Sequence, residues 1–215
     1  MALTAQDRAR KIKIILFDVD GVWTDGTIWL VPGAPHGGLS DEVRGKETVG
    51  SGAPTTMAEA KGYSAHDGTA ISLARLGGLK CGIVTRRISE TVATRARDLK
   101  LEFVYLGCAI KMQAIREIMA KEGVSLDEIC YVGDDVIDLP PMRQVGFAVA
   151  VANARDQVKA GAHYVTPNAG GYGAGRDAIE FILEAQGTLE QCIEAYIGGR
   201  NSISPSMDIG KGSST

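Results

Sequence analysis

The 215-residue sequence has no long hydrophobic run, no run of basic residues and no pair of closely spaced cysteines. Its first mostly apolar stretch, residues 12–17, is too short for a signal-peptide core or a membrane span. The formal net charge is −3, and without a basic run the chain lacks the electrostatic features of proteins that bind nucleic acid or an anionic membrane. We therefore expect a cytoplasmic protein with neither kind of partner.

The four cysteines, at positions 81, 108, 130 and 192, show no CxxC spacing. Cys81 and Cys130 lie inside apolar runs that are typical of strands. Buried thiols commonly act as small hydrophobic side chains. We therefore expect neither disulfides nor a zinc site.

What the chain does have is an alternation of short apolar runs with amphipathic segments. The apolar runs predict strands at 12–17, 81–85, 103–105, 129–132, 148–151 and 164–165. The amphipathic segments predict helices at 68–76, 88–99, 111–122, 136–144, 155–160, 176–185 and 189–197. Strands rich in Ile and Val, each followed by a helix, indicate a parallel sheet buried on both faces. The predicted fold is an α/β doubly wound sandwich, with its binding crevice at the carboxyl ends of the strands.

One Gly- and Pro-rich stretch, which includes residues 32–56, interrupts this alternation and lacks a helical period. Segments 27–31 and 57–63 on either side predict a β-hairpin flap after the first strand, inserted at about 22–66 and carrying a long loop. Residues 199–215 are typical of a flexible tail. We expect a single domain over residues 1–198.

Two aspartates end the first predicted strand. Asp18 and Asp20 lie in the run FDVDGVWTDG, where the chain is expected to turn at Gly21. Both carboxylates then reach one site at the edge of the sheet. Because strand-end turns are often rich in Asp and Gly, this pattern alone is weak evidence of function.

A second acidic cluster follows the fourth predicted strand, in the run YVGDDVIDLPPM. It contains Asp134, Asp135 and Asp138. Helix capping favours an acidic residue at such a position but does not account for three. Facing the first cluster, these carboxylates offer the oxygen ligands that Mg²⁺ prefers.

Two further polar residues stand at comparable positions. Thr85 ends the second predicted strand, and Lys111 begins a predicted helix. A lysine at a helix N-terminus opposes the helix dipole, so stability does not explain its position. Binding of an incoming phosphate explains the position of Lys111. The alternative is a surface lysine with no effect on function or stability.

The order and strand-end placement of these elements resemble the haloacid dehalogenase superfamily of phosphotransferases, over residues 11–183. The resemblance implies that Asp18 attacks phosphorus and that Asp20 is the general acid and base. It implies Mg²⁺ held by Asp18, the carbonyl of Asp20 and Asp134. A second Asp at the acid/base position is typical of the phosphatases of this superfamily and is lacking in its dehalogenases.

The same resemblance assigns the other polar residues. Thr85 and Lys111 bind the remaining phosphate oxygens. Asp135 and Asp138 lie behind the metal ligands and hold either metal-bound waters or Lys111.

Four segments narrow the resemblance to the 3-deoxy-D-manno-octulosonate 8-phosphate phosphatase family: DVDGVWTDG, AHDGTAISLA, GDDVIDLPPM and GGYGAGRDAIEFILEAQG. It implies a keto-deoxy sugar acid phosphate as substrate, no large cap domain, and a homotetramer in which a neighbour's flap and C-terminal segment help to close each active site. Close relatives act on the phosphates of nine-carbon keto-deoxy sugar acids, and the GVWTDG motif slightly favours that branch of the family. Trp23 and Trp29 are either oligomer contacts or core aromatics.

The substrate-binding positions depart from the family pattern. His66 and Ser72 stand where the family carries arginines, and Arg86 replaces a glycine, whereas Arg87 and Arg95 match basic positions. Arginine forks normally hold sugar-acid carboxylates, so an eight-carbon acid, a nine-carbon acid and another small sugar phosphate all stay open. His66 either contacts substrate or caps the helix predicted from residue 68. The candidate substrate-binding residues are His66, Asp67, Arg87, Arg95 and Arg176.

Two other classes of protein compete with a phosphatase. A phospho-accepting signalling module also uses Asp and Mg²⁺ on a doubly wound sheet, but it carries the acceptor on a middle strand and an acidic pair on the first. A catalytically idle scaffold is the other alternative, and no broken motif favours it.

Overall fold

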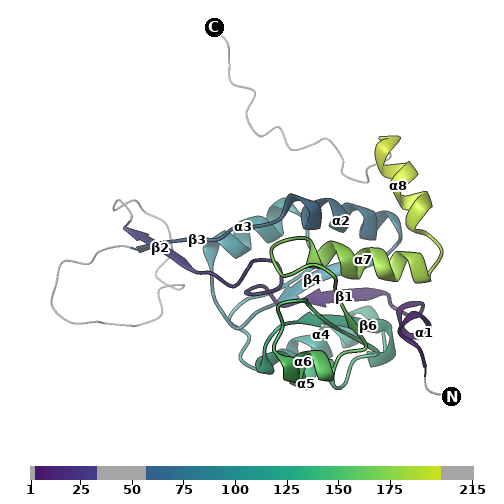
Figure 1. The fold of residues 1–215 in the computed structure, drawn as a ribbon, viewed down its shortest axis with the longest axis horizontal. Coiled ribbons are helices and arrows are strands. Elements are labelled where there is room, and N and C mark those ends of the chain that lie inside the picture. Colours follow the sequence, from purple (N-terminus) through teal and green to yellow (C-terminus); the bar gives the residue numbers. More distant parts are fainter. Residues whose placement is uncertain (1–2, 33–56, 200–215) are drawn as a thin grey trace, which may run out of the picture.

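The computed structural model describes residues 3–32 and 57–199, and its centre is a six-stranded parallel sheet (Figure 1). The strands are β1 (Ile14–Phe17), β4 (Lys80–Val84), β5 (Phe103–Tyr105), β6 (Ile129–Gly133), β7 (Phe147–Ala150) and β8 (Tyr164–Val165). Their order across the sheet is β5-β4-β1-β6-β7-β8. The predicted α/β fold with a doubly wound parallel sheet is confirmed.

Strand β1 lies in the middle of the sheet, and all four of its residues are buried. Its last residue, Phe17, pairs with Ile83 of β4 on one side and with Val132 of β6 on the other. The chain segments that follow these three parallel strands therefore emerge at the same edge. The direction of the connections reverses next to β1, and such a switch point is where open α/β sheets bind ligands.

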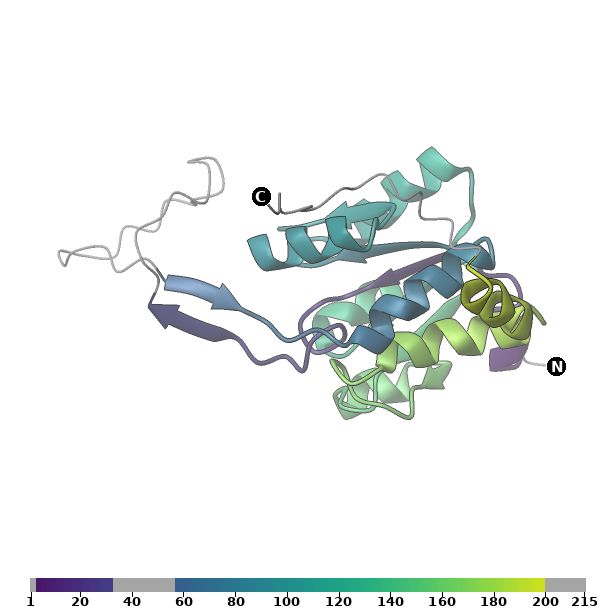
Figure 2. The same cartoon turned by 90° about the horizontal axis from the view of Figure 1, so that it is seen from above.

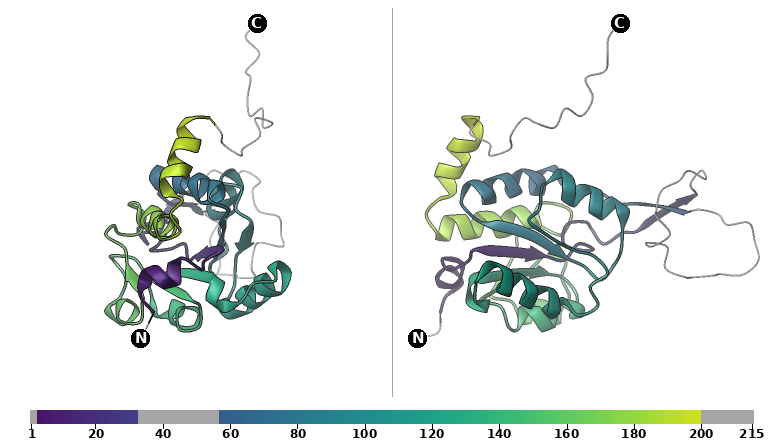
Figure 3. Two further views of the ribbon diagram at one scale, coloured as in Figure 1. Left: turned by 90° about the vertical axis from the view of Figure 1, so that its right-hand side faces the viewer. Right: turned by 180° about the vertical axis from the view of Figure 1, so that it is seen from behind.

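Helices cover both faces of the sheet (Figures 1 and 3). One layer contains α2 (Ala65–Leu76), α3 (Glu90–Asp98) and α7 (Ala174–Ala185). The other contains α4 (Lys111–Glu122), α5 (Leu139–Met142) and α6 (Asp156–Ala160). Two peripheral helices complete the fold: α1 (Ala5–Ala9) packs against α7, and α8 (Leu189–Ile197) packs against α2 and α7.

The insertion after β1 is an antiparallel hairpin of β2 (Trp29–Pro32) and β3 (Met57–Ala60), with Trp29 opposite Ala60. Figure 2 shows this hairpin projecting away from the sheet. The predicted hairpin is confirmed, and the described residues contain no cap domain. The predicted loop 33–56 and the predicted flexible tail beyond Gly199 lie outside the described residues.

The two largest departures from the predicted helix bounds have local causes. Helix α2 begins at Ala65 because the Ser64 hydroxyl accepts a hydrogen bond from the backbone N–H of His66, which makes Ser64 the N-cap. The idea that His66 caps this helix is therefore wrong. The predicted helix 136–144 is divided into a 3₁₀ turn, Val136–Asp138, and the short α5, which begins at Leu139 directly before two prolines. Proline favours a helix start and cannot donate a hydrogen bond in a helix interior.

The two tryptophans differ in burial: one belongs to the core and the other is exposed. Trp23 is 3% exposed and packs edge-to-face against Phe17 with ring centroids 5.5 Å apart, whereas Trp29 on the hairpin is 62% exposed.

All four cysteines carry free thiols, as predicted, and Cys108 is the only one that is not buried. Among residues 3–32 and 57–199, no helix is both long and apolar enough to cross a bilayer.

Candidate active site

The site begins where β1 ends. Asp18 is 4% exposed, and its backbone N–H donates to the carbonyl of Val132, so the sheet pairing continues to this residue. The chain then turns at Gly21, whose φ is +90°. A Cβ at Gly21 would lie 2.1 Å from Oδ2 of Asp134, so only glycine allows the turn to approach the second acidic cluster this closely.

Lys111 brings a positive charge to Asp18. It is the first residue of α4, a helix whose N-cap Ile110 offers no side-chain hydrogen bond, and it is 4% exposed. Its Nζ lies 3.0 Å from Oδ2 of Asp18 and 2.6 Å from Oδ1 of Asp138. The structure thus places Lys111 inside the site rather than on the surface.

Asp138 is fully buried and satisfied on both oxygens. Oδ1 accepts hydrogen bonds from Lys111 and from the hydroxyl of Tyr131, at 2.6 and 2.9 Å. Oδ2 accepts from the backbone N–H groups of Asp134 and Asp135, at 3.0 and 3.2 Å. Of the two predicted roles for Asp138, these contacts favour holding Lys111, together with the loop that follows β6.

Asp134 has a free ligand atom. Its Oδ1 is buried and has no hydrogen-bond partner in the described part of the chain. Burial, reinforced by the carboxylates of Asp138, Asp18 and Asp135, raises the pKa of Asp134 to about 7 against the opposing effect of Lys111. Burial and the Asp138 carboxylate likewise raise the pKa of Asp18 to about 6.

These features fit a divalent cation. One carboxylate oxygen each from Asp18, Asp134 and Asp138 lies within 4.8 Å of the others. Asp18 and Asp138 are buried, Asp134 is partly buried, and Lys111 pairs with Asp18 and Asp138. The excess of negative charge over this one lysine raises the pKa values beyond the effect of burial. Asp18 and Asp134 are the available carboxylate ligands because Asp138 is fully hydrogen-bonded, and an all-oxygen set suits a hard ion such as Mg²⁺.

Asp20, the second aspartate of the turn, faces a different set of residues. Lys61, whose side chain is completely screened from solvent, forms an ion pair with its Oδ1. Arg87 Nε lies 3.6 Å from its Oδ2, and both cations also pair with Glu59. Sequence reasoning missed Glu59 and Lys61, although two opposite charges at alternate positions of a predicted strand lie on the same face and were a usable clue.

Thr85 lies directly after β4, next to β1, and is 2% exposed. Its backbone N–H donates to the carbonyl of Tyr105, and its Oγ1 accepts a hydrogen bond of 3.3 Å from the N–H of Arg87. Its hydroxyl is therefore held in the turn that also positions Arg87.

A third missed residue, Asn153, joins the turn after β1 to the glycine-rich loop before α7. Its Nδ2 donates to the carbonyl of Gly21 at 3.0 Å, and its Oδ1 accepts from the N–H of Gly170 at 2.6 Å. A Cβ at Gly170 would lie 1.8 Å from the carbonyl oxygen of Gly21. The glycines of this loop therefore allow it to pack against the turn after β1.

The other candidate substrate-binding residues have structural partners of their own. Asp67 is 2% exposed, and its Oδ1 accepts from the backbone N–H of Arg176, so it caps α7 from α2. The Arg176 side chain pairs with Glu180 at 2.7 Å. Arg95 lies over the ring of Tyr63, 5.9 Å from its centroid. Contacts of these residues with substrate stay a prediction.

Two predicted residues are outside this cluster. Asp135 caps the 3₁₀ turn after β6, accepting a 2.7 Å hydrogen bond from the N–H of Val136. His66 is exposed in the first turn of α2. Neither is a metal ligand in this arrangement.

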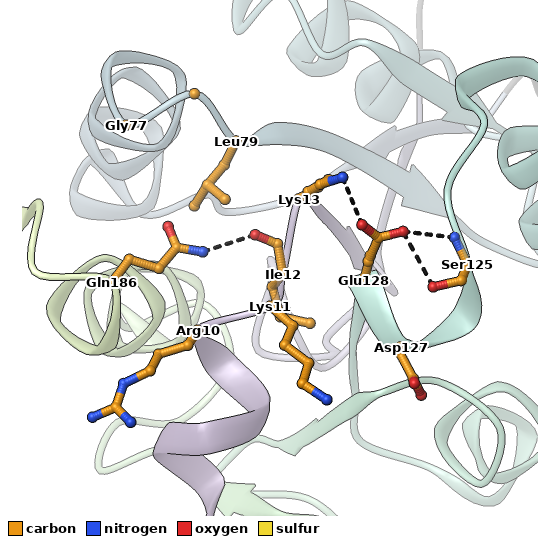
Figure 4. Close-up of a pocket in the computed structure, with 11 residues that line it drawn as sticks. Arg10, Lys11, Ile12, Lys13, Gly77, Leu79, Ser125, Asp127, Glu128 and Gln186 are labelled. Atoms are coloured by element: carbon orange, nitrogen blue, oxygen red, sulfur yellow. Dashed lines mark hydrogen bonds and ion pairs between the residues drawn. The ribbon is translucent and has the colours of Figure 1, made fainter.

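A cavity of about 590 Å³ lies at the opposite edge of the sheet, beside the amino ends of the central strands (Figure 4). Several of its polar side chains have partners: Lys13 pairs with Glu128 at 2.6 Å, Glu128 accepts from Ser125, and Gln186 donates to the carbonyl of Ile12 (Figure 4). These contacts close the amino edge of the fold. The candidate catalytic and metal-binding residues lie instead at the carboxyl edge of the sheet.

Comparison with known proteins shows the family of the chain. Residues 58–173 match the family model described as haloacid dehalogenase-like hydrolase. The 3-deoxy-D-manno-octulosonate 8-phosphate phosphatase KdsC of Escherichia coli K12 is 33% identical over 184 residues, which cover 86% of this chain and 86% of that protein.

Solved structures give the same result. The crystal structure of the 3-deoxy-D-manno-octulosonate 8-phosphate phosphatase from Yersinia pestis superposes with a TM-score of 0.73 at 32% identity, covering 86% of this chain and 88% of that one. The Moraxella catarrhalis enzyme, in complex with magnesium ion, phosphate ion and KDO, gives 0.74 at 29% identity, covering 89% and 97%. The chain therefore belongs to the haloacid dehalogenase-like hydrolases, within the family of 3-deoxy-D-manno-octulosonate 8-phosphate phosphatases.

Proposed function

We propose that this protein is a Mg²⁺-dependent phosphomonoesterase that hydrolyses a keto-deoxy sugar acid phosphate of the 3-deoxy-D-manno-octulosonate 8-phosphate type. The observation that carries the proposal is the convergence of the buried Asp18 and Lys111 with the partly buried Asp134 in one cluster at the switch point of the sheet. The activity named for the Escherichia coli and Yersinia pestis relatives supports the substrate class. So does the Moraxella catarrhalis structure with magnesium, phosphate and KDO.

The reaction assigns separate work to the two aspartates of the turn. A carboxylate oxygen of Asp18 attacks phosphorus, and the bond from phosphorus to the sugar oxygen breaks to leave an aspartyl phosphate. Asp20 gives its proton to the departing alkoxide and then takes one from the water that attacks the aspartyl phosphate. Inorganic phosphate leaves, and both aspartates return to their starting state.

The buried charges around Asp18 stabilise this transfer. Asp18, the backbone carbonyl of Asp20 and Asp134 would hold Mg²⁺, which when bound neutralises charge on the phosphoryl oxygens. Lys111 and the Thr85 hydroxyl hold the remaining phosphoryl oxygens as charge redistributes. Asp138 keeps the Lys111 ammonium directed at Asp18.

The hairpin supports the proposal that the enzyme is a homotetramer. Trp29, Leu30 and Met57 are 62, 59 and 50% exposed on it. Large apolar side chains gathered on a projecting element are typical of an interface between subunits. Such an assembly would let a neighbouring subunit complete the substrate pocket, as the family resemblance implies. Cytoplasmic location also stays a prediction.

The test of the mechanism is Asp18→Asn. An amide cannot attack phosphorus as a carboxylate does, so turnover of a generic phosphate ester with Mg²⁺ should fall to the background rate. Because Asn matches Asp in size, the circular dichroism spectrum and the oligomeric state should be preserved. Hydrolysis at the wild-type rate by a folded Asp18→Asn variant would show that the nucleophile is elsewhere.

The substrate is tested with a panel of esters at equal concentration. We expect kcat/KM for 3-deoxy-D-manno-octulosonate 8-phosphate to exceed that for plain hexose phosphates. The nine-carbon sugar acid 9-phosphates belong in the same panel, because His66 is exposed where the octulosonate enzymes usually carry an arginine. A strong preference for hexose phosphates would refute the sugar-acid assignment and leave the mechanism intact. The phosphatases of Escherichia coli and Yersinia pestis also favour an enzyme that turns over its substrate. A phospho-accepting signalling module would instead retain its phosphate.

A further inference from the structure

The hairpin reaches the catalytic turn through one buried lysine. Lys61 follows β3 directly, and its side chain has no solvent-exposed surface. The ammonium pairs with Oδ1 of Asp20 and lies 3.5 Å from Oε1 of Glu59. Burying an ammonium group costs free energy unless it is paired, so the position of Lys61 is defined by these two carboxylates.

Glu59 connects Lys61 to a second cation. Arg87, in the loop after β4, donates from Nη2 to Oε2 of Glu59 at 2.8 Å, and the Ser89 hydroxyl donates to Oε1. The same arginine lies 3.6 Å from Oδ2 of Asp20 through its Nε. Two cations and two carboxylates therefore form a closed four-residue network between the hairpin, the turn after β1 and the loop after β4.

Asp20 depends on this network for its orientation. In the described part of the chain, its carboxylate oxygens have no partners other than Lys61 and Arg87. Lys61 makes the closer contact and is screened from solvent, whereas the Arg87 side chain is 46% exposed. Lys61 is therefore the better-ordered of the two partners.

We propose that Lys61 is a positioning residue that directs the Asp20 carboxylate at the leaving-group oxygen, with Glu59 holding Lys61 in place. This inference rests on the proposed function, in which Asp20 moves the proton. A general acid is effective only when it lies within hydrogen-bond reach of the oxygen that it protonates. Losing Lys61 should therefore slow only those steps in which Asp20 transfers a proton.

The leaving group separates this role from a structural one. When the phosphoryl group moves to Asp18, a sugar or other primary alkoxide needs a proton as its bond to phosphorus breaks. 4-Nitrophenolate is a weak base and leaves as the anion, without a proton. The first step of the reaction with 4-nitrophenyl phosphate therefore serves as an internal control for Asp20.

The experiment is rapid-quench, single-turnover kinetics of Lys61→Met with Mg²⁺, comparing the release of the two leaving groups. For the primary alkyl phosphate that the wild type cleaves best, we expect alcohol release to slow by about 100-fold, within the usual contribution of a general acid. Release of 4-nitrophenolate should change by less than about 3-fold, because no proton transfer accompanies it. Lys80→Met is the matched control: its ion pair with Glu122 is 49% exposed on the lysine side, and neither rate should change.

Two further variants keep the proposal testable whether or not Lys61→Met folds. Lys61→Arg retains a cation and should restore much of the alkyl rate, and Glu59→Gln should show the same bias toward the aryl ester in weaker form. An equal loss for both esters in the folded variants, or no loss for either, would overturn the positioning role. If the wild type instead transfers phosphate to Asp18 from neither ester, it is the proposed function that fails.

Discussion

Asp18 and Asp20 are two residues apart in the chain, yet the protein holds them by different means. Asp18 is buried against Lys111, which Asp138 holds from within the core, and the Tyr131 hydroxyl donates to Asp138. Asp20 is only partly buried and is held from the hairpin and a loop by Lys61 and Arg87. The nucleophile is thus positioned by the packing of the sheet, while the acid is positioned by a peripheral element.

The difference has an energetic basis. The Lys111 and Asp138 side chains are 3 and 0% exposed, so removing one charge leaves the other uncompensated in the core. The Asp20 and Arg87 side chains are 21 and 46% exposed, and solvent screens them when the network opens. Charge loss beside Asp18 should therefore damage both stability and catalysis, whereas charge loss beside Asp20 should act mainly on catalysis.

The substitution Lys111→Met is the strongest test of this difference between Asp18 and Asp20. Methionine fills similar volume but leaves Asp18 and Asp138 without their shared cation. We expect kcat to fall by about 10³-fold and the metal-free protein to lose about 3 to 5 kcal/mol of unfolding free energy. Urea denaturation in EDTA and steady-state kinetics with Mg²⁺ check the two effects. A variant with full stability would mean that core packing, not the ion pair, sets the position of Asp18.

Gly21→Ala tests whether the turn needs its close approach to Asp134. A methyl group there would meet the Asp134 carboxylate, and alanine at φ +90° is strained by about 1 to 2 kcal/mol. We expect the Mg²⁺ concentration for half-maximal activity to rise by about 10-fold, which corresponds to roughly 1.4 kcal/mol.

Gly78→Ala is the matched control for this change. Gly78 also has a positive φ, of +80°, but a Cβ there would meet nothing within 4 Å. We expect a similar loss of unfolding free energy and an unchanged Mg²⁺ requirement. If both variants needed more Mg²⁺ for half-maximal activity, backbone strain alone would explain the increase.

The smallest effect concerns Asp67, a buried carboxylate that forms no ion pair within residues 3–32 and 57–199. Burial raises its pKa to about 6, against the hydrogen bond from Arg176 N–H. A folded pKa above the unfolded value near 3.8 means that its stabilising contribution is present at low pH and is lost as the pH rises through about 6. Asp67→Asn removes this loss, so relative to the wild type it should gain about 2 kcal/mol between pH 4 and pH 7.5.

The measurement is urea denaturation of both proteins at the two pH values. Only the change in their stability difference matters, because all other titrating groups cancel. A difference that stays constant with pH would show that Asp67 is ionised at little cost.

The sequence predicted the fold well because its strands are short apolar runs with turn residues at their ends. The runs at β1, β4 and β6 place Asp18, Thr85 and Asp134 at the carboxyl edge of a parallel sheet, and the structure brings these residues to neighbouring strand ends. Element ends were less accurate where a cap or a proline pair decides them, as at Ser64 and before Pro140.

By itself, then, the sequence determined the strand pattern, the hairpin and the two acidic turns, since each depends on residues that are neighbours in the chain. Only the tertiary structure decided what each turn contacts. Asp67 meets the N–H of Arg176 across 109 positions, and Asp20 meets Lys61 across 41. Such pairs arise from how helices and the hairpin pack on the sheet, and no local period in the sequence records that packing.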